Sequence, residues 1–218
     1  MQTNDDIYFV KKIQTKTLIL NTSLELFAGK GVQAVSLRDI AEVIGIKSAS
    51  IYYYYKTKEL LLDDLLNIFV EDFKASIELL SLKNKDANTL EAVIRNIFDE
   101  NVLSINKPGG CFGMALATRE QHNNEHARNV VSEVLFEYSV EQLKADFDRL
   151  VEKGIIPMSD TKTISFMMML CLIEINEMKV HEYMGNMLPI EHKSIHNHVK
   201  HLTAFLLQQG YSSDKINK

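Results

Sequence analysis

The stretch SASIYYYYKTKEL, residues 48–60, brings hydroxyl and ammonium groups close together. Tyr52–Tyr55 are four of the eight tyrosines in the chain, and Lys56 and Lys58 follow them. Hydroxyl groups donate hydrogen bonds to anionic oxygens, and lysine ammonium groups bind such oxygens as point charges. These residue types therefore predict a surface that contacts phosphate groups. On a helix, Ser50 could also reach the edges of bases.

Helical periodicity divides the four tyrosines among different environments. At roughly 100° per residue, Ile51 and Tyr55 share one face, whereas Tyr53 points the opposite way. Tyr52 and Tyr54 fall on the two flanks. The pattern predicts a core role for Tyr55 and a contact role for Tyr53. The partner is either DNA, with this helix in the major groove, or another protein that docks on the tyrosines; the basic neighbours favour DNA.

Start and stop signals place the tyrosines in a short helix that follows a tight turn. Residues 15–29 have helical periodicity, and Ser36 with Asp39 forms a capping-box pattern at the start of a second helix. Gly45 is suited to end that helix, and Ser48 to cap the third. Two helices joined by such a turn, with a supporting helix ahead, predict a helix-turn-helix unit.

The remainder of the chain predicts an all-α fold. Three prolines and nine glycines leave few tight turns, and the apolar residues follow helical spacing. Thr57 is expected to cap a long helix through about residue 80. Further helices are expected at 89–105, up to Lys153, at 160–183 and at 190–209, with NKPGG as the clearest loop.

Charge separates the chain into two parts. Residues 1–58 hold eight Lys/Arg and five Asp/Glu, whereas residues 59–218 hold sixteen and twenty-four. A basic head on an acidic body favours nucleic acid as a partner of the head. We therefore predict a helix-turn-helix DNA-binding domain at 1–58 and a second helical domain at 59–218.

The region from Ile19 to Leu66 closely resembles the DNA-binding region of the TetR family of bacterial transcriptional regulators. The resemblance is carried by the segment from Ser36 to Ala41, by Gly45, and by the tyrosine-rich helix followed by Lys-x-Lys-Glu-Leu. It implies a homodimer that binds a palindromic operator, most often as a repressor, and that leaves DNA when a small-molecule effector binds the second domain. A helical adaptor that uses the tyrosines to dock a partner protein is the alternative.

The resemblance also implies which residues contact double-stranded operator DNA. These are Ser36, Arg38, Lys47, Ser48, Ser50, Tyr52, Tyr53, Tyr54 and Lys58. Two positions depart from the family pattern, because Tyr54 stands where histidine is frequent and Tyr55 where phenylalanine is usual.

The second domain is implied to be a helical ligand-binding and dimerisation domain. The resemblance places the dimer contact in residues 160–183 and 190–209. Candidate pocket residues are Phe112, Met114, Phe136, Met167, Cys171, Glu174 and Met178. A carboxylate among methionines and a cysteine would suit a cationic ligand. For the segment Met167–Leu172 a place in the core or the dimer interface is the preferred interpretation, with Glu174 paired across it. A place in the core is preferred for Phe112, Met114, Phe136 and Phe147.

No pattern indicates an enzyme, a cofactor or a metal site. His122 and His126, and the group His192, His196, His198 and His201, lack partner ligands and are interpreted as solvated or interface residues. Cys111 and Cys171 have no CxxC spacing, which favours a reducing cytoplasm over a disulfide scaffold. The chain has no apolar run of membrane-spanning length and no signal-peptide pattern at its start, so we expect a soluble cytoplasmic protein.

Overall fold

The computed structural model describes residues 4–98, 108–156, 160–185 and 204. Every regular element within these ranges is a helix, which confirms the all-α prediction. The helices of the first part are α1 (Asn4–Lys30), α2 (Leu37–Val43), α3 (Ser48–Tyr54) and α4 (Lys58–Asn84). Those of the second part are α5 (Leu90–Ile97), α6 (Pro108–Glu120), α7 (Glu125–Asn129), the π-helix η1 (Val130–Tyr138), α8 (Ser139–Glu152) and α9 (Thr161–Tyr183).

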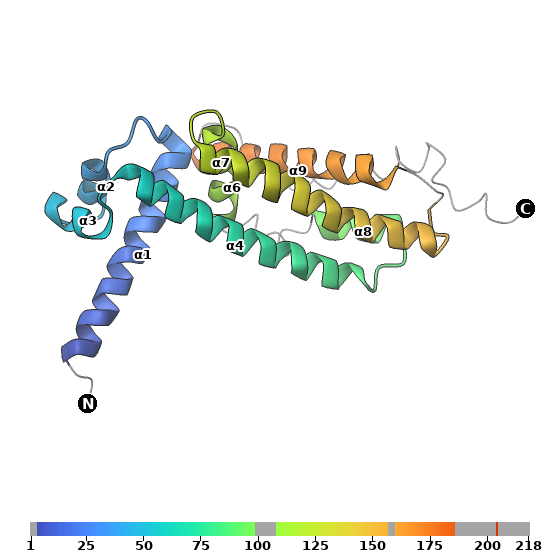
Figure 1. Cartoon of the computed structure of the whole chain (residues 1–218), viewed down its shortest axis with the longest axis horizontal. Coiled ribbons are helices and arrows are strands. Elements are labelled where there is room, and N and C mark those ends of the chain that lie inside the picture. The colour runs from blue at the N-terminus through green and yellow to red at the C-terminus, as the bar shows by residue number, and fades with distance from the viewer. Residues whose placement is uncertain (1–3, 99–107, 157–159, 186–203, 205–218) are drawn as a thin grey trace, which may run out of the picture.

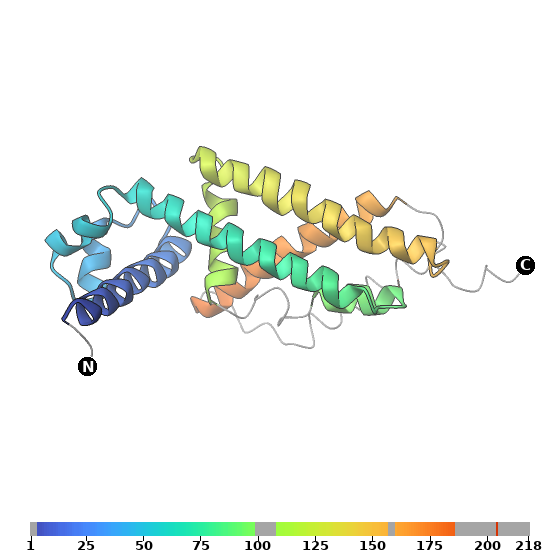
Figure 2. The same ribbon diagram turned by 60° about the horizontal axis from the view of Figure 1, so that its bottom comes forward.

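Helix α4 runs from the helix-turn-helix unit into the body of the protein. Figure 1 shows α2 and α3 at one end of the molecule, with α4, α8 and α9 extending away from them. After a 60° turn, α6 lies across the other helices of the body (Figure 2). None of the described helices is both long and apolar enough to cross a lipid bilayer. The short unit α2–α3 is thus carried at the tip of a larger helical body.

One buried face of α4 contributes to the core of both the helix-turn-helix region and the body. Thr57 caps the helix, because its Oγ1 accepts a hydrogen bond from the Leu60 N–H at 3.3 Å. Leu61 in the first turns and Phe69 further along are both buried. Spacings of three, four and seven residues keep such side chains on one face, which explains why a single helix can close two regions of core.

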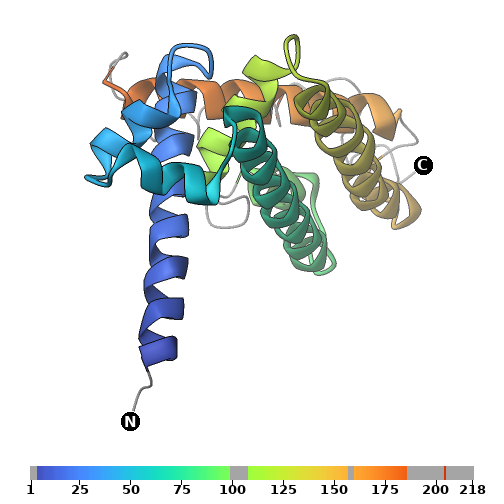
Figure 3. The same ribbon diagram turned by 60° about the vertical axis from the view of Figure 1, so that its left-hand side comes forward.

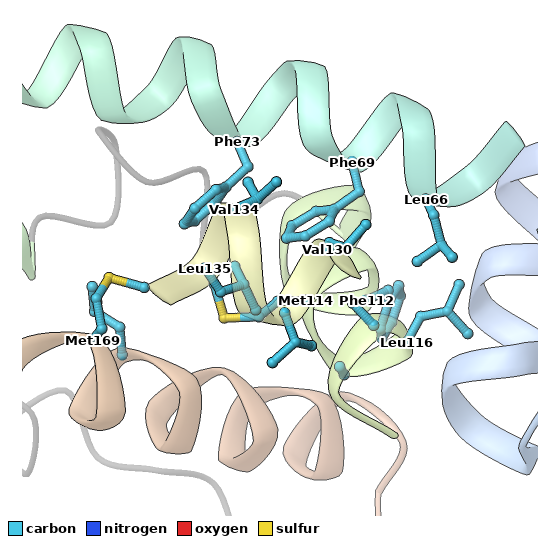
Figure 4. Close-up of a cluster of buried hydrophobic side chains, with 14 of the residues drawn as sticks. Leu66, Phe69, Phe73, Phe112, Met114, Leu116, Val130, Val134, Leu135 and Met169 are labelled. Carbon is cyan, nitrogen blue, oxygen red and sulfur yellow. The ribbon is translucent and has the colours of Figure 1, made fainter. Parts of the chain in front are cut away.

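The body core lies between α4, α6, η1 and α9. Figure 4 shows Phe69 and Phe73 of α4 above Val130 and Val134 of η1, with Met169 of α9 on the opposite side. Helix α6 approaches α4 closely at Gly113. A Cβ atom there would lie 2.5 Å from Cδ2 of Phe69, so only glycine fits without movement of the ring.

The structure corrects several expected helix boundaries. Helix α1 begins at Asn4 rather than near residue 15, and α4 continues to Asn84 rather than to about residue 80. The second half of NKPGG is helical, because α6 begins at Pro108, where a missing N–H costs no hydrogen bond. Apart from residue 204, the expected helix at 190–209 lies outside the described residues.

The long helix before Lys153 contains a wide turn that periodicity did not predict. Its middle segment, η1, is a π-helix, and α7 and α8 continue it on either side. The Ser139 hydroxyl donates to the carbonyl of Val134, five residues earlier, at 2.8 Å. A π-helix shifts the register of the side chains that follow, and such segments are rare enough that an apolar pattern alone seldom reveals them.

Candidate nucleic-acid interface

Helix α2 begins with the predicted capping box. The Ser36 Oγ accepts from the Asp39 N–H at 3.2 Å, and the Ser36 N–H donates to Asp39 Oδ2 at 2.8 Å. The Ser36 hydroxyl also donates to Asp39 Oδ2 at 2.8 Å, and the two hydrogen bonds that the Ser36 N–H and hydroxyl donate lower the pKa of Asp39, so the carboxylate stays charged at the helix N-terminus. Ser36 and Arg38 are both exposed at this end of α2.

The turn between α2 and α3 is a Schellman motif. The Ile46 N–H donates to the Ala41 carbonyl at 2.9 Å, and the Gly45 N–H to the Glu42 carbonyl at 3.1 Å. Gly45 has φ of 72°, in the left-handed region that glycine enters at little cost. The sequence-based assignment of this turn is confirmed, and it determines how α3 leaves α2.

Lys47, not Ser48, is the N-cap of α3. Lys47 has an extended backbone, and its carbonyl accepts from the Ser50 N–H at 2.8 Å, whereas Ser48 is already helical. The predicted side-chain cap by Ser48 is therefore wrong, because no side-chain cap hydrogen bond forms at this end. The Ser48 and Ser50 side chains are exposed, together with Lys47.

The tyrosines divide as the helical wheel predicts. Ile51 is fully buried and Tyr55 is 4% exposed, whereas Tyr53 is 57% exposed and Tyr52 is 37% exposed. The Tyr54 ring is half-buried and meets the Tyr53 ring edge to face, with centroids 5.2 Å apart. One detail differs from the prediction: Tyr55 follows the last residue of α3 and has an extended backbone.

Tyr55 is held by charged groups from two other helices. Its hydroxyl donates to Asp64 Oδ2 of α4 at 2.9 Å, and Lys16 of α1 binds the same oxygen at 3.0 Å. The Lys16 ammonium also lies 5.7 Å from the centroid of the Tyr55 ring. Burial, and then the hydrogen bond to Asp64, raises the pKa of Tyr55. Burial alone would raise the pKa of Asp64, but the hydrogen bonds from Lys16 and Tyr55 outweigh it and lower that pKa.

Lys58 points inward rather than to solvent. Its Nζ donates to the carbonyls of Val32 at 2.6 Å and Val35 at 3.1 Å, in the turn between α1 and α2. An ammonium group has three hydrogens, so one remains for a phosphate. Lys58 thus fixes the entry into α2, and its predicted phosphate contact stays a prediction.

Lys12 is a candidate contact residue that the sequence reasoning did not identify. Its ammonium lies 5.3 Å from the centroid of the Tyr53 ring, and its side chain is exposed. Figure 3 shows the first half of α1 projecting past the helix-turn-helix unit. The sequence predicted a helix that begins near residue 15, so helical periodicity could not place Lys12 beside α3.

The candidate pocket residues occupy different environments. Phe112 and Met114 are buried in the core, as Phe147 is, which confirms the preferred interpretation for these three. Phe136 is half-buried and packs on Phe166 with ring centroids 5.2 Å apart. Met167, Cys171 and Met178 are half-buried along α9, and Glu174 is exposed. A ligand site made by this set stays a prediction.

The histidines within the described ranges show no metal-binding arrangement. His122 is exposed, and the His126 Nδ1 lies 3.1 Å from Asp63 Oδ1 of α4. No three His, Cys, Asp or Glu side chains of the described ranges are placed to hold a metal ion. The four histidines from His192 to His201 lie outside those ranges.

Comparisons with known proteins agree with this geometry. The family model "Bacterial regulatory proteins, tetR family" matches residues 19–65, which cover the C-terminal part of α1, the helix-turn-helix unit and the start of α4. The transcriptional repressor KstR2 of Rhodococcus jostii is 32% identical over 85 residues, which are 38% of this chain and 42% of KstR2. IcaR of Staphylococcus epidermidis, a negative transcriptional regulator of a biofilm operon, is 25% identical over 130 residues, 56% of this chain and 68% of IcaR.

Solved structures extend the likeness of fold beyond the matched segment. A tetR-family regulatory protein from Rhodococcus RHA1 superposes with a TM-score of 0.64 at 14% identity, covering 89% of this chain and 96% of that one. A gamma-butyrolactone receptor described as ArpA-like has a TM-score of 0.60 at 20% identity, covering 92% and 99%. The amino-terminal region therefore matches the TetR family model, and the fold of the chain resembles that of solved structures from this family.

Proposed function

We propose that the protein is a transcriptional regulator that binds DNA through α2 and α3. One observation carries the proposal: Ile51 of α3 and the following residue Tyr55 are buried, whereas Ser50, Tyr52 and Tyr53 of α3 are exposed. A short helix anchored in this way can enter a major groove without losing its attachment to the protein. The exposed hydroxyl groups can contact base edges and phosphates, and Lys47 and Arg38 can bind phosphates.

A homodimer and a palindromic operator form the second part of the proposal. One α3 reads only a few base pairs, and two such helices reach successive major grooves about 34 Å apart. Helix α9 supports a dimer contact, because Phe166 and Leu170, one turn apart, are 44% and 46% exposed. Charge also supports this orientation on DNA, since residues 1–58 hold more basic than acidic residues whereas residues 59–218 hold more acidic than basic ones.

Repression and release by a small-molecule effector complete the proposal. The matched segment of KstR2 belongs to a repressor, and the IcaR match to a negative regulator. One structure with the same fold is a gamma-butyrolactone receptor, so a body of this architecture can serve as a receptor for a small molecule. We infer a regulator that acts on DNA in the cytoplasm and catalyses no reaction.

The direct test is selection of binding sites from genomic DNA, followed by footprinting of the recovered sites. We expect a protected palindrome, and an affinity that falls steeply as salt rises because phosphate contacts release counterions. Recovery of no palindrome would refute DNA regulation and leave the exposed tyrosines to a protein partner. In that case Tyr53→Ala would disrupt a protein complex instead.

A further inference from the structure

Three helices that are distant in sequence meet at Arg119, in the last turn of α6. The Arg119 Nη1 donates to the Ala28 carbonyl at the end of α1. On its other side, Nη2 lies 2.5 Å from Oε2 of Glu177 on α9, and Nε donates to Oε1 at 3.1 Å. We refer to Ala28, Arg119 and Glu177 as the Arg119 clasp. It joins α1, α6 and α9 through a single side chain.

The end of α1 is a favourable place for a guanidinium group. The last carbonyls of a helix have no partner within the helix, and they carry the negative end of its dipole. In α1 the Phe27 carbonyl is satisfied by the Gly31 N–H, and Arg119 satisfies the next carbonyl along. The Arg119 and Glu177 side chains are only 30% and 25% exposed, so solvent screens the pair less than it screens a surface ion pair.

A second contact between α9 and α1 lies beside the clasp. Met184, the C-cap of α9, packs against Gly29, where a Cβ atom would lie 2.8 Å from Cε of the methionine. The absence of a side chain at Gly29 therefore permits α9 to approach the helix axis of α1. Helix α9 consequently touches α1 directly and does not depend on α4 for this connection.

The same end of α1 is also fixed from α4. Lys58 binds the carbonyls of Val32 and Val35, in the turn that leads into α2. One cation from α6 and one from α4 thus hold consecutive parts of the segment from Ala28 to Val35. Because α2 and α3 follow this segment, its position determines where the exposed face of α3 points.

Helix α9 is in turn set by the interior of the body. Met168, Met169 and Leu172 are buried, and Figure 4 shows Met169 facing the core beneath η1. A rearrangement of that core would move α9, and Glu177 lies on the same rigid helix. The contacts therefore form a continuous chain from the body core through Glu177 and Arg119 to α1.

We propose that Arg119 is a positioning residue, through which α9 sets the orientation of the DNA-binding unit relative to the body. The inference rests on the proposed DNA-binding function, and it adds a connection through α6 and α9 to the one that α4 makes. Loss of the clasp removes one of the contacts that hold the C-terminal end of α1, so the two recognition helices of a dimer keep their separation less firmly. Discrimination between operator spacings should decrease before the fold is lost.

The test uses the full-length protein and a selected palindrome, together with versions that have one or two base pairs inserted between the half-sites. Arg119→Gln and Glu177→Gln each remove the ion pair. We expect about a tenfold loss of affinity for the natural spacing. We also expect the affinity for the natural spacing, divided by the affinity for an altered spacing, to move toward one. The double variant should lose no more than Arg119→Gln alone, because that variant already removes both the ion pair and the hydrogen bond to Ala28.

Arg95→Gln is the matched control. It breaks the ion pair between Arg95 and Glu91 on α5, where the two side chains lie 2.6 Å apart. It also changes the net charge as Arg119→Gln does. Arg119→Lys keeps the charge but not the two-point geometry, and it should restore binding in part. If Arg119→Gln and Glu177→Gln keep the wild-type spacing ratio, the inference is wrong.

Amide hydrogen exchange separates failure of this inference from failure of the proposed function. If the wild-type protein binds no DNA, the proposed function fails, but the clasp still makes a prediction. Amides of residues 28–36 should exchange faster in Arg119→Gln and Glu177→Gln than in Arg95→Gln, without DNA present. Equal exchange in all three variants would overturn the positioning role on its own.

Discussion

Adjacent tyrosines in this protein have different physical roles because their directions differ. Tyr53 is exposed and lies beside Lys12, whereas Tyr55 is buried and donates its hydroxyl hydrogen to Asp64. Helical geometry predicts this division from the sequence. It does not predict the partner of the buried hydroxyl, because Asp64 and Lys16 reach it from separate helices.

The division predicts opposite effects for two alanine substitutions. Tyr55→Ala should reduce the free energy of unfolding by about 3 kcal/mol or more, because it removes a buried ring and leaves a cavity. Tyr53→Ala should change that free energy by less than about 1 kcal/mol but weaken operator binding about tenfold. Thermal melts and binding curves on both variants separate the effects. Equal losses of melting temperature would contradict the assignment.

Lys12 should contribute one phosphate contact beside Tyr53. Lys12→Gln should lower the slope of log affinity against log salt by about 0.9, the value for one phosphate contact on duplex DNA. Lys74→Gln is a matched control, because the Lys74 ammonium lies 5.4 Å from the centroid of the Tyr138 ring, within the body. A reduced slope in the control as well would mean that net charge, not position, is responsible.

Because the pKa of the Tyr55 hydroxyl is raised in the folded protein, we expect a loss of stability at alkaline pH. Its pKa is raised in the folded protein above the ordinary value of 10.0, so the unfolded chain loses this proton first as pH rises. The stabilisation is complete below pH 10 and declines above it. Melts from pH 8 to 11 should fall more steeply for the wild type than for Tyr55→Phe. Burial also raises the pKa of Tyr138, but Tyr138 is present in both proteins and contributes equally to the pH dependence of their stability.

At the scale of elements, the sequence correctly predicts helix ends and turns whose hydrogen bonds join residues close in sequence. The Ser36 capping box, the Gly45 turn and the Thr57 cap each depend on residues within a few positions, and all three are present. Local reasoning failed where distant packing decides. The inward direction of Lys58 depends on the carbonyls of Val32 and Val35, which lie in a turn of the chain far from Lys58 in sequence.

Gly113 is the element-scale position most sensitive to size. Gly113→Ala would place a methyl group among the ring atoms of Phe69, so α4 and α6 must separate or the ring must rotate. We expect a loss of about 1–3 kcal/mol in the free energy of unfolding. Gly29→Ala is the comparison, because the nearest atom there is the end of the flexible Met184 side chain. Urea denaturation should show a smaller loss for Gly29→Ala, and the reverse order would contradict this packing argument.

At the scale of the whole molecule, the predicted boundary between residues 58 and 59 falls at the start of a continuous helix. Leu61 and Phe69 are buried at two levels of α4, and the Arg119 clasp adds a connection between α1 and the body. A segment that depends on such shared contacts does not melt independently. The domain division stays a prediction, and the contacts indicate that the two parts are coupled in stability.

Coupling of this kind predicts one unfolding transition observed by two different probes. The chain has no tryptophan, and five of its eight tyrosines lie within residues 1–58, so tyrosine fluorescence reports mainly on the amino-terminal part. Far-ultraviolet circular dichroism reports on all the helices. At fixed protein concentration the two urea transitions should coincide. Gly113→Ala, a change within the body, should move both midpoints together. A fluorescence midpoint that stays in place while the dichroism midpoint shifts would mean that α1–α3 unfold separately, because neither α4 nor the clasp then transmits stability between the two parts.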